Sequence, residues 1–388
     1  MTATDPHPSP HPTPRPAPRP GSTRIGRETF FLPGPTEVRP AVLAAMTRPM
    51  IGHRSAAFRA LFARLQDGLR TVFGTQRPVF IASSSATGLM EAAIRNAPAG
   101  PVLALVNGGF SERFARIAAA CGRRVDRYDV PWGSVHDPAI VTTRIRDGGH
   151  TTVTVVHSET STGVLTDVRA IADAAHAAGA VCCVDSVSGI RGAELRFDAW
   201  GLDFVLTGSQ KALALPPGLA FAVASDAFVG RGASENRGVY FDLAEFATAA
   251  ARDEAPNTPA LPLYFALDVQ LEAVLAEGLE QAWARHAAMA ARTAAWVDEL
   301  RREGIALAIL APAGHRSPTV TAVVLPPAVS AKAVVDAVAA RGFTIGTGYG
   351  RLADTTIRIG HMGDHTVGGL ADCLAACRSA LIEVAKPG

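Results

Sequence analysis

The chain has 388 residues, of which 48% are hydrophobic and 19% charged, with a formal net charge of +2. This length accommodates two domains that share a large core, and the small net charge argues against nucleic acid and membrane surfaces as partners. No apolar run reaches the roughly 20 residues that a transmembrane helix requires, which argues against a membrane-spanning protein.

The N-terminal residues and the cysteines indicate the compartment. The first seven residues lack the charged start and apolar core of a signal peptide. Five cysteines are an odd number, and Cys182 and Cys183 adjoin inside a strand-like run, which favours reduced thiols. We therefore expect a cytoplasmic protein. Residues 1–28 alternate proline with polar residues and are predicted to be a disordered tail without a metal site.

The folded part is predicted to begin at residue 29, close to a rigid turn. Pro33 and Pro35 restrict the backbone there, while Gly34 between them lets the chain approach a ligand closely. Apolar residues at helical spacing then predict helices at 39–47 and 55–74.

A short strand from residue 80 leads into the helix start Ser85-Ala86-Thr87, which allows two interpretations. Backbone N–H groups at a helix N-terminus bind phosphate, and serine and threonine hydroxyls add donors. A serine at this position can equally serve as a simple helix cap. The local sequence leaves both open.

Strands and helices alternate through the middle of the chain. Phe110 follows one strand exit directly after Asn-Gly-Gly, so we expect its ring to lie over a pocket. The alternation predicts an α/β fold with a mostly parallel, doubly wound sheet, which binds ligands at the carboxyl ends of its strands. The predicted strands are 102–106, 124–128, 151–156, 180–185, 204–208 and 218–224, with a helix at 167–178 before the fourth.

Two charged residues stand at the ends of otherwise apolar strands, Asp185 and Lys211. Desolvation favours the neutral amine of such a lysine, which then forms Schiff bases with carbonyl compounds. A buried carboxylate requires a cation nearby. Pyridoxal phosphate uses both groups, a lysine for its aldehyde and an acid beside its ring nitrogen. At about 4 Å that acid–pyridinium attraction is roughly 4 kcal/mol. A lone lysine would be an ordinary surface residue, but the aspartate favours the cofactor.

The C-terminal part is predicted to begin within one long helix at 262–302 and to contain strands near 305–310 and 318–325 and a helix at 331–341. Arg358 lies inside an apolar strand and needs an anionic partner, either a ligand or a carboxylate of its own domain. Cys373 and Cys377, four residues apart on the last helix, are interpreted as packing residues.

The motifs Val184-Asp185-Ser186-Val187 and Gly208-Ser209-Gln210-Lys211-Ala212 resemble the class V aminotransferases of fold type I. The resemblance is strongest to the alanine–glyoxylate and serine–glyoxylate (serine–pyruvate) branch and extends from about residue 31 to 381. It implies a large pyridoxal-phosphate-binding domain at 29–282, a small α+β domain at 283–388, and a homodimer whose active sites are shared at the interface.

The resemblance also implies roles for individual residues. Lys211 and Asp185 would be catalytic, and Gly34 and Arg358 would contact the substrate, with Arg358 gripping its α-carboxylate. Phe110 would stack on the pyridine ring, where relatives often have tryptophan, and Val187 would pack on the opposite face. The remaining expected cofactor contacts are Ser85, Ala86 and Thr87 at the phosphate (where many relatives have Ser-Gly-His), Thr160, Gln210, and Thr258 reaching the phosphate of the neighbouring subunit.

The function that the resemblance implies is a pyridoxal-phosphate aminotransferase. By a ping-pong Schiff-base mechanism it would move an amino group from alanine, serine or a similar amino acid to glyoxylate or pyruvate. A 2-aminoethylphosphonate–pyruvate aminotransferase is the closest alternative. A cysteine desulfurase would need a loop cysteine beyond the lysine. A cofactor-binding protein without catalytic activity is the alternative of another class.

Overall fold

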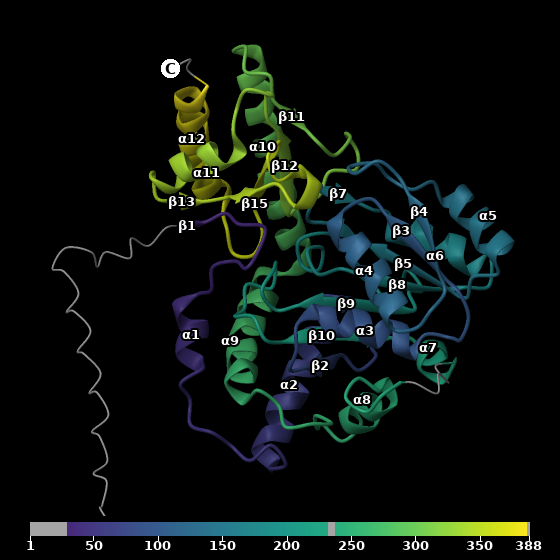
Figure 1. Ribbon diagram of the computed structural model, residues 1–388. Coiled ribbons are helices and arrows are strands. Elements are labelled where there is room, and N and C mark those ends of the chain that lie inside the picture. The colour runs from purple at the N-terminus through teal and green to yellow at the C-terminus, as the bar shows by residue number, and fades with distance from the viewer. Residues whose placement is uncertain (1–28, 232–236, 386–388) are drawn as a thin grey trace, which may run out of the picture.

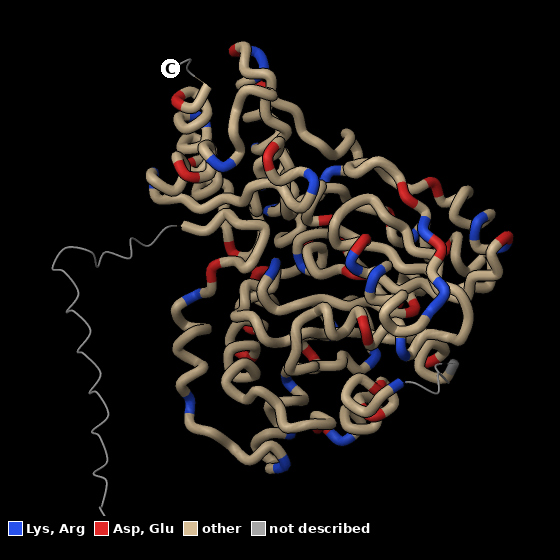
Figure 2. Tube along the Cα trace, viewed as in Figure 1, with Lys and Arg blue, Asp and Glu red and all other residues tan. Residues whose placement is uncertain are grey.

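The computed structural model describes residues 29–231 and 237–385, so the tail expected at 1–28 lies outside the described residues. A large part is built around a central sheet, and a smaller part, formed mainly by the C-terminal third, lies against it (Figure 1). Acidic and basic residues are interspersed through both parts, as the small net charge leads one to expect (Figure 2). Among the described helices, none is both long enough and apolar enough to cross a membrane.

The central sheet is mostly parallel, as predicted. Its seven strands lie in the order β2-β10-β9-β8-β5-β3-β4, and only β10 runs against its neighbours. All strands except the edge strand β4 are fully buried. In spatial order they are β2 (Phe80–Ala82), β10 (Ala220–Ala224), β9 (Phe204–Gly208), β8 (Val181–Asp185), β5 (Thr152–Val156), β3 (Val102–Val106) and β4 (Val125–Asp129).

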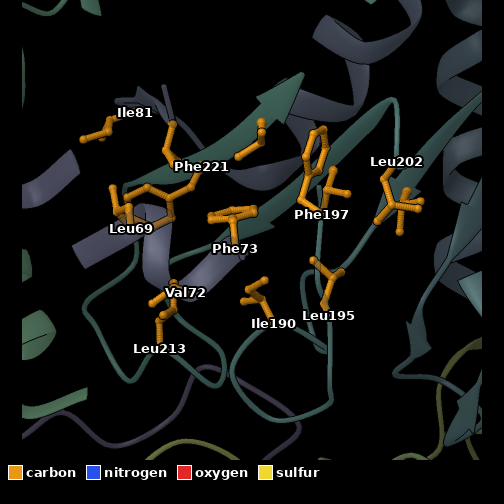
Figure 3. Close-up of a cluster of buried hydrophobic side chains, with 14 of the residues drawn as sticks. Leu69, Val72, Phe73, Ile81, Ile190, Leu195, Phe197, Leu202, Leu213 and Phe221 are labelled. Atoms are coloured by element: carbon orange, nitrogen blue, oxygen red, sulfur yellow. The ribbon is translucent and has the colours of Figure 1, made fainter. Parts of the chain in front are cut away.

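Each face of the sheet has its own hydrophobic core, because successive strand side chains point to opposite faces. In β8, Cys182 and Val184 belong to one core, while Val181 and Cys183 belong to the other. Phe73, at the end of one helix, and Phe221 of β10 lie in the first core (Figure 3). The helices over the sheet are α2 (Ala56–Phe73), α3 (Ala86–Asn96), α4 (Gly109–Ala120), α5 (Pro138–Gly148), α6 (Val168–His176), α7 (Asp226–Arg231) and α8 (Leu243–Ala250).

The prediction of a single helix at 262–302 is wrong. The structure has two helices, α9 (Leu261–Glu277) and α10 (Leu279–Arg302), separated by Gly278. Gly278 has φ +80°, a conformation that glycine adopts without the steric cost other residues meet, and this turns the chain between the helices. The apolar pattern continues across the break, which is why it predicted one helix.

The smaller part contains an antiparallel four-stranded sheet in the order β11-β12-β15-β14. Cys373 and Cys377 lie fully buried in its core, so their interpretation as packing residues is confirmed. Its elements are β11 (Ala308–Ile309), β12 (Val320–Val324), α11 (Ala331–Ala339), β13 (Phe343–Thr344), β14 (Gly346–Thr347), the 3₁₀ turn η1 (Gly350–Leu352), β15 (Thr356–Gly360) and α12 (Val367–Val384).

The N-terminal segment ties the two parts together. Strand β1 (Thr29–Phe30) pairs with β13 of the smaller part, and the chain then runs past the large sheet into α1 (Pro40–Ala45). The N–H of Gly360 donates to the carbonyl of Phe31 at 2.7 Å, so this segment also lies against the end of β15. Two short strands, β6 (Ser158–Glu159) and β7 (Val164–Leu165), form a separate hairpin.

Gly360 leaves no room for a side chain at this crossing. A Cβ there would overlap the backbone of Leu32 and lie 2.7 Å from the nitrogen of Pro33. We expect Gly360→Ala to lower the free energy of unfolding by about 2–3 kcal/mol, as overpacking against backbone does. Urea denaturation measures the change.

The matched control is Gly368→Ala, in the first turn of α12, where a Cβ would meet nothing within 4 Å. That variant should unfold at an unchanged or slightly higher urea concentration, since alanine favours helix by at most about 1 kcal/mol. Equal effects of the two substitutions would show that the close approach at Gly360 carries no cost.

Candidate active site

A cavity of about 350 Å³ opens at the carboxyl edge of the central sheet, between the sheet and the N-terminal segment. Most of the predicted site residues line this cavity, and of those residues only Thr258 and Arg358 do not. The predicted residues that line it are Gly34, Ser85, Ala86, Thr87, Phe110, Thr160, Asp185, Val187, Gln210 and Lys211.

Lys211 follows β9 and is almost completely buried, with 7% of its surface exposed. The pKa of its amine is lowered to about 8, mainly by burial and also by the positive charges of Arg358 and Arg113, while Asp185 acts in the opposite direction. The Nζ atom donates a hydrogen bond to the carbonyl of Pro33. A substantial fraction of the amine is therefore neutral, and nucleophilic, near physiological pH.

Gly34 fits against the lysine for a steric reason. It has φ +95°, and a Cβ at this position would lie 2.6 Å from Nζ of Lys211. Any larger residue would both strain the backbone and displace the amine. The turn predicted at residues 33–35 thus forms one wall of the cavity.

Asp185 stands at the end of β8, the strand next to β9, so parallel pairing brings it to the same edge as Lys211. The pKa of its carboxyl is raised to about 7, mainly by burial and also by the negative charge of Glu159. The N–H of Val187, which donates to Oδ1 at 2.8 Å, and the positive charges of Lys211 and Arg113 act in the opposite direction. A cation placed against Asp185 inside the cavity would restore its ionisation.

The start of α3 has the properties of an anion site. Ser85 is the N-cap residue, yet its side chain makes no capping hydrogen bond. Ser85 and Thr87 are exposed at the cavity, and Ala86 is buried between them. The first N–H groups of a helix have no partners within the helix, and the helix dipole favours negative charge there. The simple-cap interpretation of Ser85 is therefore not supported.

The ring of Phe110 is held beside the cavity by the first turn of α4. The carboxylate of Glu159 accepts hydrogen bonds from the N–H groups of Phe110 and Ser111, which fixes the start of this helix. Phe110 lies 5.2 Å from the ring of Tyr349, centroid to centroid, and the Lys211 amine is 6.0 Å from its centroid.

Thr160 and Val187 complete the wall close to Asp185. Thr160 is buried, and its hydroxyl lies 2.5 Å from that of Ser188. Val187 is half-buried and follows Asp185 by two residues.

Arg358 lies in β15, and no carboxylate among the described residues of the smaller part pairs with it. Within the described residues its guanidinium donates to two backbone carbonyls, of Thr347 at 2.9 Å and of Thr160 at 3.3 Å. Burial lowers the pKa of Arg358, and Glu159 and Tyr349 act in the opposite direction. Its bond to Thr160, itself a lining residue, places the guanidinium beside the cavity.

Thr258 does not reach the cavity of its own chain. It is exposed and lines a separate, smaller pocket together with Tyr240 and Tyr264. The expected contact with a neighbouring subunit stays a prediction.

Sequence reasoning missed Arg113 and Tyr349. Arg113 lines the cavity, donates to the hydroxyl of Tyr349 at 2.9 Å, and lies over the ring of Phe110. Its position three residues after Phe110 on one helix was a usable signal, because such residues share a face. Tyr349 comes from the smaller part, and no local pattern indicates where it lies.

The cysteines lie away from this chemistry. None of them lines the cavity, and four of the five are buried in the cores. A cysteine desulfurase needs a cysteine that can reach the substrate, so the structure does not support that alternative.

Comparison with known proteins gives a consistent result. Residues 34–354 match the family model of the class-V aminotransferases. The chain is 35% identical to the L-aspartate–glyoxylate aminotransferase of Paracoccus denitrificans over 92% of each chain. It is 34% identical to the serine–glyoxylate aminotransferase of Methylorubrum extorquens, over 93% of this chain and 92% of that one. The alanine–glyoxylate aminotransferase structure from Nostoc sp. superposes with a TM-score of 0.86 at 28% identity, over 94% of this chain and 97% of that one.

The lowered pKa of Lys211 predicts how its reactivity depends on pH. The chain has three lysines, and the exposed Lys332 provides an internal reference. In the full-length protein without cofactor, trace acetylation of Lys211 should rise with a midpoint near pH 8, because only the neutral amine reacts. Mass spectrometry of the two lysine peptides gives the ratio at each pH. A midpoint near the ordinary lysine value of 10.5 would mean that the amine is solvated.

Proposed function

The chain belongs to the class-V aminotransferase family, and on this premise we propose that it transfers the amino group of a small amino acid to glyoxylate. The observation that carries the proposal is the meeting of Lys211 and Asp185 in one cavity from neighbouring parallel strands. The relatives named above act on glyoxylate with aspartate, serine or alanine, which supports this acceptor. Pyruvate is the second acceptor that we propose to test.

Pyridoxal phosphate is the cofactor of this family, and the residues of the cavity fit it. The α3 start offers N–H groups and hydroxyls for a phosphate, Asp185 offers a carboxylate for a pyridinium, and Lys211 offers an amine for the aldehyde. Phe110 and Val187 are proposed to contact the two faces of the ring. When bound, the cofactor supplies an electron sink that lowers the cost of removing the substrate Cα proton.

The protein's own residues have separable roles in the reaction. Lys211 would take the proton from the substrate Cα as general base and return it as general acid, because a buried amine with a pKa of about 8 can both accept and donate a proton near neutral pH. Arg358 orients the substrate through its α-carboxylate by two parallel hydrogen bonds. Asp185 would hold the pyridinium nitrogen of the bound cofactor and, ionised by that positive charge, would stabilise it.

The assembly and location are also part of the proposal. We propose a homodimer, supported by the exposed position of Thr258 outside its own cavity, where it is free to contact a second copy. A cytoplasmic location is supported by the five cysteines, all of which are free thiols.

A half-reaction screen tests the proposed function. Purified enzyme is mixed with alanine, serine or aspartate, and the loss of the bound cofactor's visible absorbance is followed. Aspartate belongs in the screen because Arg113 places a guanidinium on the cavity wall, in addition to that of Arg358 beside the cavity. At least one donor should convert the cofactor, and glyoxylate should restore the absorbance.

Lys211→Ala should retain cofactor while losing on the order of 10²–10⁴-fold in rate, the usual contribution of general acid–base catalysis. Full activity of that variant would falsify the proposal.

Arg358→Ala should weaken both half-reactions, because the amino acid and the oxo acid use the same carboxylate contact in turn. We expect a loss of roughly 2–4 kcal/mol of transition-state stabilisation, which lowers kcat/KM about 30- to 1000-fold for each substrate. Arg358→Lys should recover little, since a point charge cannot reproduce a planar fork. Single-turnover kinetics with an amino acid and, separately, with glyoxylate measure this. If both stay within about threefold of the unmodified enzyme, the carboxylate is bound elsewhere.

A further inference from the structure

Arg191 is a buried charged residue for which the proposed reaction gives no role. It is 1% exposed, and its backbone has φ +63°, a conformation that costs free energy for any residue with a side chain. Its neighbour Ile190 is fully buried in the core shown in Figure 3. A side chain held in this way at a glycine-type position indicates a role that compensates for the strain.

The guanidinium of Arg191 joins three separate segments. One nitrogen, Nη2, donates to Glu277 Oε2 and to Asp364 Oδ1, both at 2.8 Å. The other, Nη1, donates to the carbonyl of Ala212, also at 2.8 Å. Glu277 is the last residue of α9, Asp364 follows β15 in the smaller part, and Ala212 directly follows Lys211.

Both carboxylates have further cationic partners. Arg285 of α10 binds Glu277 through two hydrogen bonds, at 2.6 and 3.0 Å, and Arg39 binds Asp364 at 2.7 Å. Although burial raises the pKa of Asp364, the guanidinium groups of Arg191 and Arg39 outweigh it and leave this pKa below its ordinary value. Asp364 is therefore ionised at neutral pH, and its bond to Arg191 is charge-assisted.

The network spans the junction between the two parts of the chain. Glu277 immediately precedes Gly278, where the chain turns between α9 and α10. Asp364 lies on the segment that leaves β15, the strand that carries Arg358. Leu213, the residue after Ala212, is fully buried in the same core as Ile190 (Figure 3). A shift of the smaller part would thus reach the Lys211 loop through one rigid guanidinium.

We propose that Arg191 is a positioning residue that fixes the Lys211 loop relative to the smaller part, and hence relative to Arg358. This inference rests on the proposed function, because the position of the Lys211 amine relative to the Arg358 guanidinium matters only for a substrate that contacts both. An arginine is needed because its planar guanidinium reaches three acceptors on three segments at once. The ammonium of a lysine, on a flexible stem, would hold the three acceptors less well.

The environment of the Lys211 amine provides a readout that general destabilisation does not move. The charged groups facing it are Arg358 from β15, Asp185 from β8 and Arg113 from α4, and burial is the largest influence on its pKa. If the loop loses its anchor, water reaches the amine and the pKa rises toward 10.5. The midpoint of the acetylation curve reports this pKa, independently of access to the reagent, which sets the plateau.

The experiment compares four full-length proteins without cofactor: the unmodified chain, Arg191→Gly, Asp364→Asn and Arg39→Ala. Lys211 acetylation is measured against pH with Lys332 as the reference, and thermal unfolding is recorded for each. Arg191→Gly relieves the backbone strain while removing the anchor. Asp364→Asn removes the carboxylate of the smaller part at nearly constant size. Arg39→Ala removes the outer, exposed partner of the same carboxylate and is the matched control.

We expect Arg191→Gly to raise the midpoint by about one pH unit or more, which lowers the reactive fraction at pH 8 on the order of fivefold. Asp364→Asn should shift it in the same direction, and Arg39→Ala should leave it near 8. If Arg191→Gly does not fold, Asp364→Asn carries the test alone. A midpoint near 8 in the folded Arg191→Gly or Asp364→Asn protein, or an equal shift in Arg39→Ala, would overturn the proposal. The labelling uses no substrate, so a failure of the proposed function leaves this result interpretable.

Discussion

Burial moves the pKa of Lys211 downward and that of Asp185 upward, so both groups titrate close to neutral pH. Each shift comes mainly from the absence of water, and the two residues attract each other only weakly in comparison. The sheet enforces this arrangement, because parallel pairing of β8 and β9 brings both strand ends to one edge. The tight turn at Gly34 and the ring of Phe110 form parts of the cavity wall close to these two groups.

The sequence was sufficient to predict the sheet and the residues at its edge. Apolar strands that end in Asp185 and Lys211 carry a strong signal, since charges at the end of a buried strand require a reason. The order of strands and helices then predicted which loops meet. The assignment of the α3 start to a phosphate and of Gly34 to the substrate came from the family resemblance, since neither segment alone indicated the cavity.

What the sequence could not predict depends on contacts between distant segments. Tyr349 reaches Phe110 from the smaller part, and its position follows only from how that part lies against the sheet. Arg191 reads as an ordinary loop arginine until its φ and its two carboxylates are known. The sequence did not predict the break at Gly278, because the apolar pattern of α9 continues into α10. The turn depends only on the backbone conformation of this one residue.

The N-terminal segment has a consequence for the order in which the site is assembled. The bond from Lys211 to Pro33 spans 178 residues, and the bond from Arg358 to Thr160 spans 198. Contacts of such sequence separation form late, because the entropy of closing long loops opposes them until the intervening domain is folded. During synthesis, β15 emerges after all seven strands of the central sheet, because it follows them in the sequence. A nascent chain therefore contains Lys211 and Asp185 before it contains Arg358, and the contact between Arg358 and Thr160 has to wait for the smaller part.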